Sequence, residues 1–326
     1  MKSLARDVAI AFLLGVIVPA AAIQMHLLFR RDVERDVPQA IIQEPVSVEP
    51  EKAENPRMIL FRAAEGPVSY VELEEYIVGA VLGEMPAYFE PEALKAQAVA
   101  ARTYACKAQV SGGKHGDGSV CADYSCCQAY ISEEQYLAMG GDVASVQKIR
   151  SAVRATENLV LTYEGALIEA TYFSCSGGKT EDAVAVWGND YPYLRSVESP
   201  GEEHALYYRD EVAFSRKELE QALGLTLPED PDSWFGEITY TQGEGVDTIR
   251  IGDSLFSGTM LRRLLNLRST AFSLRIEENA AVFATRGYGH RVGMSQYGAD
   301  AMAASGATFA EILSHYYPGT ELEMLR

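Results

Sequence analysis

One alanine-rich segment constrains the fold more than any other part of the chain. Residues 92–109 are rich in good helix formers, and Pro91 stands where a first helical turn accepts proline. Leu94, Ala98 and Ala101 recur at spacings of four and three and form one face. Because alanine side chains are short, this face predicts a helix with another element packed closely against it.

The carboxyl group of Glu84 lies just before this helix, among apolar neighbours. Leu82, Met85 and Phe89 crowd it, and such surroundings make a carboxylate costly to ionise, so its pKa should rise. A glutamate of raised pKa serves as a general acid near neutral pH. A second helical pattern at residues 68–82 would place Glu84 on a loop between two packed helices. The alternative is that Glu84 only caps a helix or occupies a turn.

Composition restricts the class of partner. The chain has 326 residues, enough for one large domain or two, and 48% of them are hydrophobic, which supports a folded core. Its formal net charge is −18. Because phosphate binding needs clustered Lys and Arg, this charge argues against a nucleic-acid partner. It argues equally against a basic helix lying on a membrane surface.

The N-terminal region has the composition of a membrane anchor. Residues 8–29 are nearly all apolar, about the length needed to cross a bilayer. We expect a transmembrane anchor at residues 1–31, with a cleaved secretory signal as the alternative because alanines 20–22 resemble a signal-peptidase site. Residues 32–56, rich in Glu, Asp, Val and Pro, predict an extended linker. Residues 57–326 would then form a body outside the cytoplasm.

Helical patterns come first in this body, and short strands follow. Residues 132–157 form a further helical stretch, and β-type runs at 159–163 and 168–173 flank the hairpin-turn pair Glu164-Gly165. This order predicts an α+β fold, in which a helical front half precedes a β-rich second half that forms a substrate groove. The other expected elements are helices at 215–223 (with Ser215 as N-cap and Gly224 as the stop), 260–267 and 309–316, and strands at 236–242, 248–251, 272–277 and 281–285.

Two loops combine glycine with polar side chains. One is residues 174–181, SCSGGKTE, directly after a predicted strand, and the other is residues 286–298, RGYGHRVGMSQYG. Glycine lets a ligand approach the backbone, and Ser, Gln, Tyr and Arg offer the hydrogen bonds that sugars require. Each loop alone is compatible with a simple tight turn. Together with Glu84 they predict a polar groove.

Several of these segments resemble one known family, the stage II sporulation protein D (SpoIID) family. The resemblance covers nearly all of the chain after the linker and includes the N-terminal anchor. The residues that carry it are 83–105, the 174–181 loop, Trp187, Pro192-Tyr193-Leu194, Ser257-Gly258 with Leu261-Arg262, and Gly289-His290 with Gly293-Met294-Ser295-Gln296.

The resemblance implies a peptidoglycan lytic transglycosylase of endospore-forming bacteria, anchored in the mother-cell membrane during engulfment of the forespore. Its substrate would be denuded glycan strands, whose stem peptides a partner amidase has removed. A membrane protein of the engulfment machinery would be a further partner. The family's catalytic glutamate falls on Glu84. The alternative is a non-catalytic peptidoglycan-binding or scaffold protein that activates the amidase.

A single carboxylate suffices for this reaction. An ordinary glycosidase needs two carboxylates at the scissile bond, and the sequence offers only Glu84 as an outstanding candidate. In a lytic transglycosylase the C6 hydroxyl of the muramic acid attacks C1 and gives a 1,6-anhydro sugar. One glutamate can therefore act first as acid and then as base. We expect no organic cofactor.

The resemblance and the groove chemistry together suggest substrate-binding residues. Arg102, Arg286 or Arg291 would recognise the free lactyl carboxylates of a denuded glycan, although Arg102 is otherwise an exposed or capping helix residue. His290 would orient substrate or, alternatively, anchor its own loop. The family usually has glycine at Arg291, and an arginine there puts the form of the 286–298 loop in doubt. The family also usually has a small hydroxyl residue at Cys175. The predicted substrate-binding residues are Arg102, Ser176, Tyr288, His290, Ser295, Gln296 and Tyr297.

The loop at residues 111–128 holds possible metal ligands. His115, Cys121, Cys126 and Cys127 are of the types that zinc prefers in a closed tetrahedral site, although adjacent ligands strain such a site. A disulfide, which an extracytoplasmic compartment permits, and unpaired thiols are the alternatives. Five cysteines leave at least one unpaired in any case. The sequence therefore predicts a structural zinc that pins this loop near the groove, with a disulfide as its main rival.

Overall fold

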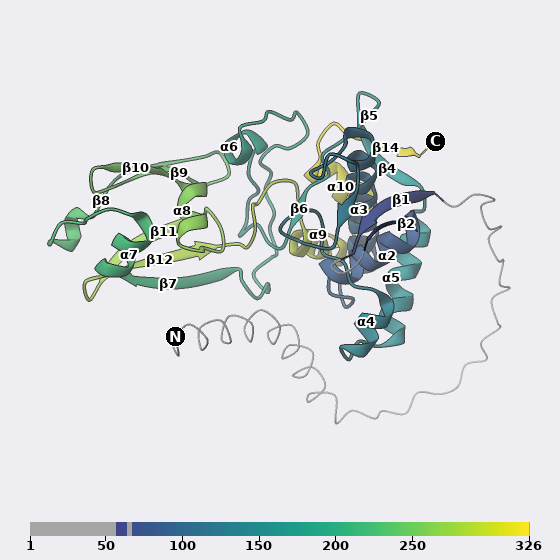
Figure 1. Ribbon diagram of the computed structural model, residues 1–326, viewed down its shortest axis with the longest axis horizontal. Coiled ribbons are helices and arrows are strands. Elements are labelled where there is room, and N and C mark those ends of the chain that lie inside the picture. The colour runs from purple at the N-terminus through teal and green to yellow at the C-terminus, as the bar shows by residue number, and fades with distance from the viewer. Residues whose placement is uncertain (1–56, 64–66, 326) are drawn as a thin grey trace. The chain divides into compact units, whose positions relative to one another are not determined.

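The computed structural model describes residues 57–63 and 67–325 (Figure 1). The expected anchor at residues 1–31 and linker at residues 32–56 lie outside these ranges. Within them, no helix combines the length and the hydropathy needed to cross a membrane.

Contacts divide the described chain into a short segment, Ser132–Val143, and a main body made of Arg57–Ile131 and the chain from Ala144 onward. The short segment contains α4 (Glu133–Ala138), and the next helix is α5 (Val143–Ala155). The helical stretch predicted over residues 132–157 is therefore helical, but it is divided into two helices. Gly140 has a φ of +92°, and a residue in this left-handed region ends a helix.

The main body begins with a small sheet and two helices. β1 (Met58–Arg62) pairs antiparallel with β2 (Val68–Glu72) and parallel with β3 (Val120–Cys121). α2 (Leu73–Glu84) and α3 (Pro91–Ser111) follow and pack against each other. The predicted helix at 68–82 is thus wrong in its first turn, because β-type residues at 68–72 pair with β1 and satisfy their backbone groups there.

The alanine face of α3 is a packing surface, as predicted. Ala98, Ala101 and Ala105 are fully buried. Besides α2, α3 packs against α9 (Gln296–Ala304) and α10 (Phe309–Tyr316), which lie beside it in Figure 1. The helix begins at Pro91 and ends before Gly112, whose φ of +84° closes it. The short alanine side chains let α2, α9 and α10 approach α3 closely.

Two pairings connect the helices to the rest of the main body. β4 (Leu159–Tyr163) lies between β5 (Ala166–Leu167) and β14 (Glu321–Met324) and packs on α3. The predicted turn is confirmed, since Glu164 and Gly165 have φ values of +51° and +75°, as a two-residue hairpin turn requires. The strand predicted at 168–173 shortens to β6 (Tyr172–Phe173), which pairs in parallel with β13 (Met294–Ser295).

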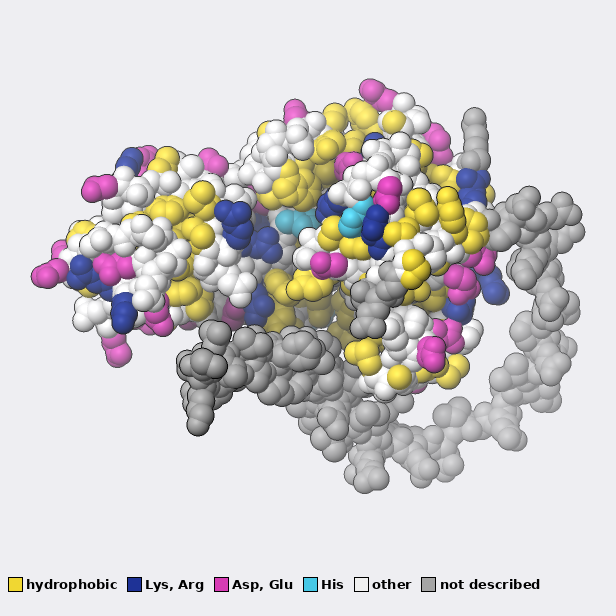
Figure 2. Space-filling view, viewed as in Figure 1, with side chains coloured by type: hydrophobic (Ala, Val, Ile, Leu, Met, Phe, Trp, Pro, Cys, Tyr) yellow, Lys and Arg dark blue, Asp and Glu magenta, His cyan; other side chains and the backbone are white. Residues whose placement is uncertain are grey.

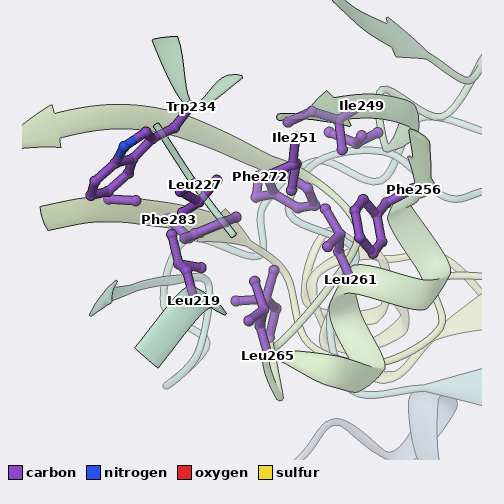
Figure 3. Packing of buried hydrophobic residues seen from close by; sticks show 13 residues of the cluster. Leu219, Leu227, Trp234, Ile249, Ile251, Phe256, Leu261, Leu265, Phe272 and Phe283 are labelled. Carbon is purple, nitrogen blue, oxygen red and sulfur yellow. The ribbon is translucent and has the colours of Figure 1, made fainter. Parts of the chain in front are cut away.

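Residues 209–286 form a second group of elements with its own core. One sheet has the order β11-β12-β7 and the other β10-β9-β8, both antiparallel. Figure 3 shows Phe272, Phe283 and Leu261 packing between these strands and α8. The bounds are β7 (Arg209–Ser215), α7 (Arg216–Leu223), the 3-10 helix η1 (Pro231–Ser233), β8 (Phe235–Tyr240), β9 (Val246–Ile251), β10 (Ser254–Ser257), α8 (Gly258–Leu264), β11 (Phe272–Glu277) and β12 (Ala280–Arg286), and α6 (Ala183–Trp187) precedes them.

Local signals locate these elements well. α7 has the predicted cap, in which the Ser215 hydroxyl accepts from the Glu218 backbone, and Gly224 ends the helix with a φ of +69°. The described chain is a mixed α+β protein with several small sheets, as the sequence predicts.

We expect Phe283→Ala to destabilise the main body by about 3–5 kcal/mol, because it removes a fully buried ring that packs on Phe214 and Phe272 and leaves a cavity. Leu255→Ala is the matched control, since Leu255 is 60% exposed on a neighbouring strand, and it should change stability by less than about 0.5 kcal/mol. Guanidinium unfolding measures both. Equal effects of the two substitutions would contradict this description of the core.

Candidate active site

Glu84 is the last residue of α2, which extends two residues beyond the predicted end at Leu82, so the prediction that Glu84 lies on a loop is wrong. Its Oε1 accepts a hydrogen bond of 2.5 Å from the Ala129 backbone N–H. Its Oε2 accepts one of 3.3 Å from the Gln296 side chain. Three segments distant in sequence therefore meet at this one carboxyl group.

Burial raises the pKa of the Glu84 carboxyl from its ordinary value of 4.5 to about 7. The hydrogen bonds from Ala129 and Gln296 oppose the rise, because both stabilise the charged form. Desolvation exceeds them, as the apolar neighbours in the sequence predict. Near neutral pH, Glu84 is thus divided between its acid and its carboxylate form, which suits a group that both donates and accepts a proton.

A polar network that the sequence did not reveal lies behind this carboxyl group. The Tyr172 hydroxyl donates to Gln128 Oε1 at 2.5 Å, and Gln128 Nε2 donates to the Tyr76 hydroxyl at 2.9 Å. Gln128 is next to Ala129 in the chain, so the network fixes the backbone donor that holds Glu84. Gln128 is almost fully buried. In the sequence, the only indication of this role for Gln128 is its position directly after Cys126-Cys127.

The 174–181 loop is built around a buried carboxylate, Glu202, that sequence reasoning missed. Glu202 accepts hydrogen bonds from the Ser176 N–H and hydroxyl, the Gly177 N–H and the Ser199 hydroxyl, at 2.6–3.0 Å. Ser176 is fully buried. The prediction that Ser176 contacts substrate is therefore wrong, because its hydroxyl fastens the loop to Glu202.

Arg291 also has an internal role instead of a substrate contact. It is 1% exposed, and its guanidinium lies 3.2 Å from the equally buried Glu181. It donates further hydrogen bonds of 2.7 Å to the carbonyls of Ser176, Lys179 and Gly243. Arg291 does adopt the glycine-like conformation, with a φ of +67°. The buried contacts offset the strain of that backbone shape.

Two more arginines proposed as carboxylate receptors are already paired. Arg102 is fully buried, with its guanidinium 2.6 Å from Glu74 and a further bond to the Leu159 carbonyl. The predictions that Arg102 binds substrate, or is exposed, are both wrong, because the crowded face of α3 encloses it. Arg286 is exposed but lies 2.9 Å from Glu244.

The remaining predicted substrate residues divide into two groups. Ser295 is fully buried and caps α9 by accepting from the Gly298 N–H, so its predicted substrate contact is wrong. Gln296 binds Glu84 directly. Tyr288 and Tyr297 stay partly exposed, and Tyr297 packs edge-on against Phe89 in the turn that follows Glu84, with ring centroids 4.9 Å apart. Tyr297 therefore borders the site, whereas Tyr288 packs against Tyr207.

His290 anchors its own loop, which is one of the two roles that the sequence predicted for it. Its Nδ1 accepts from the Val292 backbone N–H at 3.1 Å, and its ring lies 5.1 Å from that of Trp187. Burial, with a further contribution from the nearby Arg262, lowers the pKa of His290 to about 3. His290 is therefore neutral at physiological pH.

The four predicted metal ligands converge in space. The ligand atoms of His115, Cys121, Cys126 and Cys127 all lie within 4.8 Å of one another. His115 Nε2 is 3.7 Å from Cys126 Sγ and 3.6 Å from Cys127 Sγ, and the two sulfurs are 3.9 Å apart. All five cysteines of the chain lie in the described ranges, and all are free thiols.

The fold and the site define an α+β protein in which a partly buried carboxyl group of raised pKa lies among polar side chains. The family model for the stage II sporulation protein SpoIID matches residues 62–163. Stage II sporulation protein D of Bacillus amyloliquefaciens is 39% identical over 287 residues, which cover 86% of this chain and 83% of that protein. Its counterpart in Bacillus subtilis is 40% identical over 268 residues, 81% of this chain and 78% of that protein.

This chain belongs to the SpoIID family. It is also similar to the amidase enhancer of Bacillus subtilis, with 29% identity over 303 residues that cover 75% of this chain and 40% of that protein. The family that the motifs predicted is thus confirmed, and Gln296 of these motifs contacts the carboxyl of Glu84.

We expect Glu84→Gln to stabilise the protein only above about pH 5. The folded pKa of about 7 exceeds the ordinary 4.5, so the native state favours the protonated form, and the wild type loses stability as pH rises from 4.5 through 7. Glutamine imitates the protonated form. The gain should be on the order of 2–3 kcal/mol at pH 8 and near zero at pH 4. Thermal unfolding at both pH values measures it, and a gain of equal size at both would contradict the assignment.

Proposed function

We propose that this protein is a peptidoglycan lytic transglycosylase that cleaves denuded glycan strands to 1,6-anhydro-muramic acid ends during engulfment in sporulation. The observation that carries the proposal is the carboxyl group of Glu84, held by Ala129 and Gln296, with a pKa that burial raises to about 7. Membership of a family of sporulation proteins supplies the biological setting.

The surroundings of Glu84 favour an intramolecular attack over hydrolysis. A hydrolase uses two carboxyl groups, one of which activates water or attacks the sugar. In the part of the chain that the structure describes, the pKa of Glu84 responds to burial and two neutral donors and to no second carboxylate. One group must therefore handle the proton at both stages, and a nucleophile within the substrate meets that requirement.

The two oxygens of Glu84 have different tasks in this reaction. Oε1 is held by the short bond from Ala129, which orients the carboxyl group. Oε2 has only the longer contact with Gln296 and is free to carry the proton. Protonated Glu84 gives this proton to the glycosidic oxygen as the bond to C1 breaks. The resulting carboxylate then takes the proton of the C6 hydroxyl as that oxygen bonds to C1, which restores the acid.

Digestion of amidase-treated peptidoglycan, followed by mass analysis, tests the proposal. The wild type should release anhydro-ended fragments, and Glu84→Gln should lower their yield at least 100-fold, since general acid–base catalysis typically contributes about 10²–10⁴. Glu237→Gln, on the exposed surface of β8, should leave the yield unchanged.

Reducing-end products would instead identify a hydrolase. Strand binding without any product, in a wild type that still stimulates the amidase, would support the second candidate function, a scaffold that activates a partner amidase. The similarity to the amidase enhancer of Bacillus subtilis favours that second function. The two functions are compatible in one chain.

The cysteine loop fits a structural zinc ion, which we include in the proposal. Tetrahedral zinc, with Zn–S near 2.3 Å and Zn–N near 2.0 Å, separates its ligands by roughly 3.5–3.8 Å. The observed separations of 3.6–3.9 Å among His115, Cys126 and Cys127 agree with this. Cys127 precedes Gln128 and Ala129, so the ion would fix the backbone that holds Glu84. Its role is to stabilise the loop, since it would be closed to further ligands.

Metal analysis of protein purified without a histidine tag should find about one zinc per chain, and Cys121→Ser should abolish it because three ligands do not close a structural site. Cys106→Ser, which changes a cysteine of α3 that is not part of the cluster, should keep the zinc. Absence of zinc together with fewer than five free thiols would establish the disulfide and contradict this part of the proposal.

The proposed location follows from the reaction. Glycan strands lie outside the cytoplasm, so the main body would act in the space between the mother-cell and forespore membranes, with residues 1–31 as its anchor. An amidase and a membrane protein of the engulfment machinery would be its partners. The composition of residues 8–29 supports the anchor.

A further inference from the structure

A cavity of about 530 Å³ lies beside His290, and none of the roles described above uses it. Trp187 at the end of α6 forms one wall, and Met260, Arg262 and Arg263 of α8 form another. Figure 2 shows basic side chains gathered next to a histidine on the face turned to the viewer. The family motif Ser257-Gly258 with Leu261-Arg262 thus contributes to this cavity.

The charge of the cavity is unusual for this chain. Two arginines line it and no Asp or Glu does, although the chain has a net charge of −18. A second cavity, of about 400 Å³, has Arg209 and Arg286 together with three acidic residues in its wall. The cavity beside His290 therefore presents uncompensated positive charge.

The two arginines are free to bind a ligand. Arg263 is exposed and forms no ion pair within the described ranges. Arg262 is half-buried, and its Nε donates to the Arg268 carbonyl at 3.3 Å. This bond orients the guanidinium and leaves its two terminal nitrogens available to donate to a ligand. By contrast, Arg102, Arg286 and Arg291 all pair with carboxylates of the chain. Arginine suits carboxylate recognition because its donors match both oxygens.

The apolar wall suits a sugar ring. Trp187 is 41% exposed and Met260 is 42% exposed. These two side chains therefore present a large apolar surface at the cavity. The Trp187 ring packs against the His290 ring at 5.1 Å, and His290 is fixed by its own hydrogen bond to Val292. A rigid aromatic face beside polar donors is the arrangement that binds a ring with one apolar side.

The cavity is connected to the acid. His290 is hydrogen-bonded to the backbone of Tyr172, whose hydroxyl donates to Gln128. Gln128 is followed by Ala129, the residue that holds Glu84. One continuous set of contacts therefore links the cavity wall to the Glu84 carboxyl.

We propose that the cavity is a subsite for a sugar that carries a carboxylate, with Arg262 and Arg263 binding the carboxylate and Trp187 packing on the ring. The inference rests on the proposed function and specifies its substrate: a glycan in which an anionic sugar lies next to the cleaved bond. The carboxylate has two sources in peptidoglycan, the free lactyl group of a denuded sugar and the carboxylates of a stem peptide.

Binding measured in the Glu84→Gln background tests the subsite without cleavage. The probes are denuded glycan, glycan that keeps its stem peptides, and neutral chitin oligosaccharides of equal length. Arg263→Gln and Arg262→Gln should each weaken binding of denuded glycan about tenfold, the loss expected for one charged hydrogen-bonded contact. Binding of chitin oligosaccharides should change less than twofold. Arg250→Gln, an exposed arginine of β9, is the matched control and should change neither.

Each outcome decides the matter. A loss confined to denuded glycan assigns the lactyl carboxylate, and a loss confined to the peptide-bearing glycan assigns the stem-peptide carboxylate. Equal losses for chitin oligosaccharides, or none for any probe with Arg263→Gln, would overturn the proposal. The subsite and the proposed activity can fail separately. If the Glu84→Gln protein binds carboxylate-bearing glycan more tightly than chitin oligosaccharides while the wild type yields no anhydro product, the subsite is supported and the proposed transglycosylase activity is contradicted.

Discussion

The short hydrogen bond from the Ala129 backbone to Glu84 is the contact on which the site depends. A buried carboxyl group in an apolar surrounding needs a fixed donor to keep one orientation, and a backbone N–H provides one that no rotamer change removes. The chain just before this donor is itself held in place. Gln128 is bound to Tyr76 and Tyr172, and the Cys-His cluster lies just before it in the chain. Burial then sets the pKa while this backbone contact sets the direction of the carboxyl group.

Buried charge elsewhere in the main body serves the same purpose of holding loops. Glu202 binds the backbone of the Ser-Gly-Gly loop, and Arg291 with Glu181 fastens that loop to the one containing His290. Such pairs give little net stability, because desolvation offsets their attraction, but removing one partner is costly. The motif residues Ser176 and Arg291 therefore hold these loops together.

The sequence predicted what depends on local chemistry. The helix at α3, the Ser215 cap of α7 and the turn at Glu164 follow from propensity, capping and backbone conformation. The sequence also predicted the raised pKa of Glu84, because the apolar neighbours of this residue adjoin it in the chain. Periodicity could not reveal contacts made by distant segments, such as Gln296 with Glu84. The roles of Arg102 and Ser176 were wrong for that reason: their partners, Glu74 and Glu202, adjoin them only in the fold.

The central claim is that burial raises the pKa of the Glu84 carboxyl to about 7, so that a substantial fraction stays protonated near neutral pH and one group could donate and then accept a proton. Carbon-detected NMR titration of the glutamate side-chain carboxyls tests it most directly, with Glu84→Gln identifying the resonance. The account predicts a titration midpoint near pH 7. A midpoint at or below the ordinary value of about 4.5 would contradict it, because Glu84 would then be ionised when the glycosidic oxygen needs its proton.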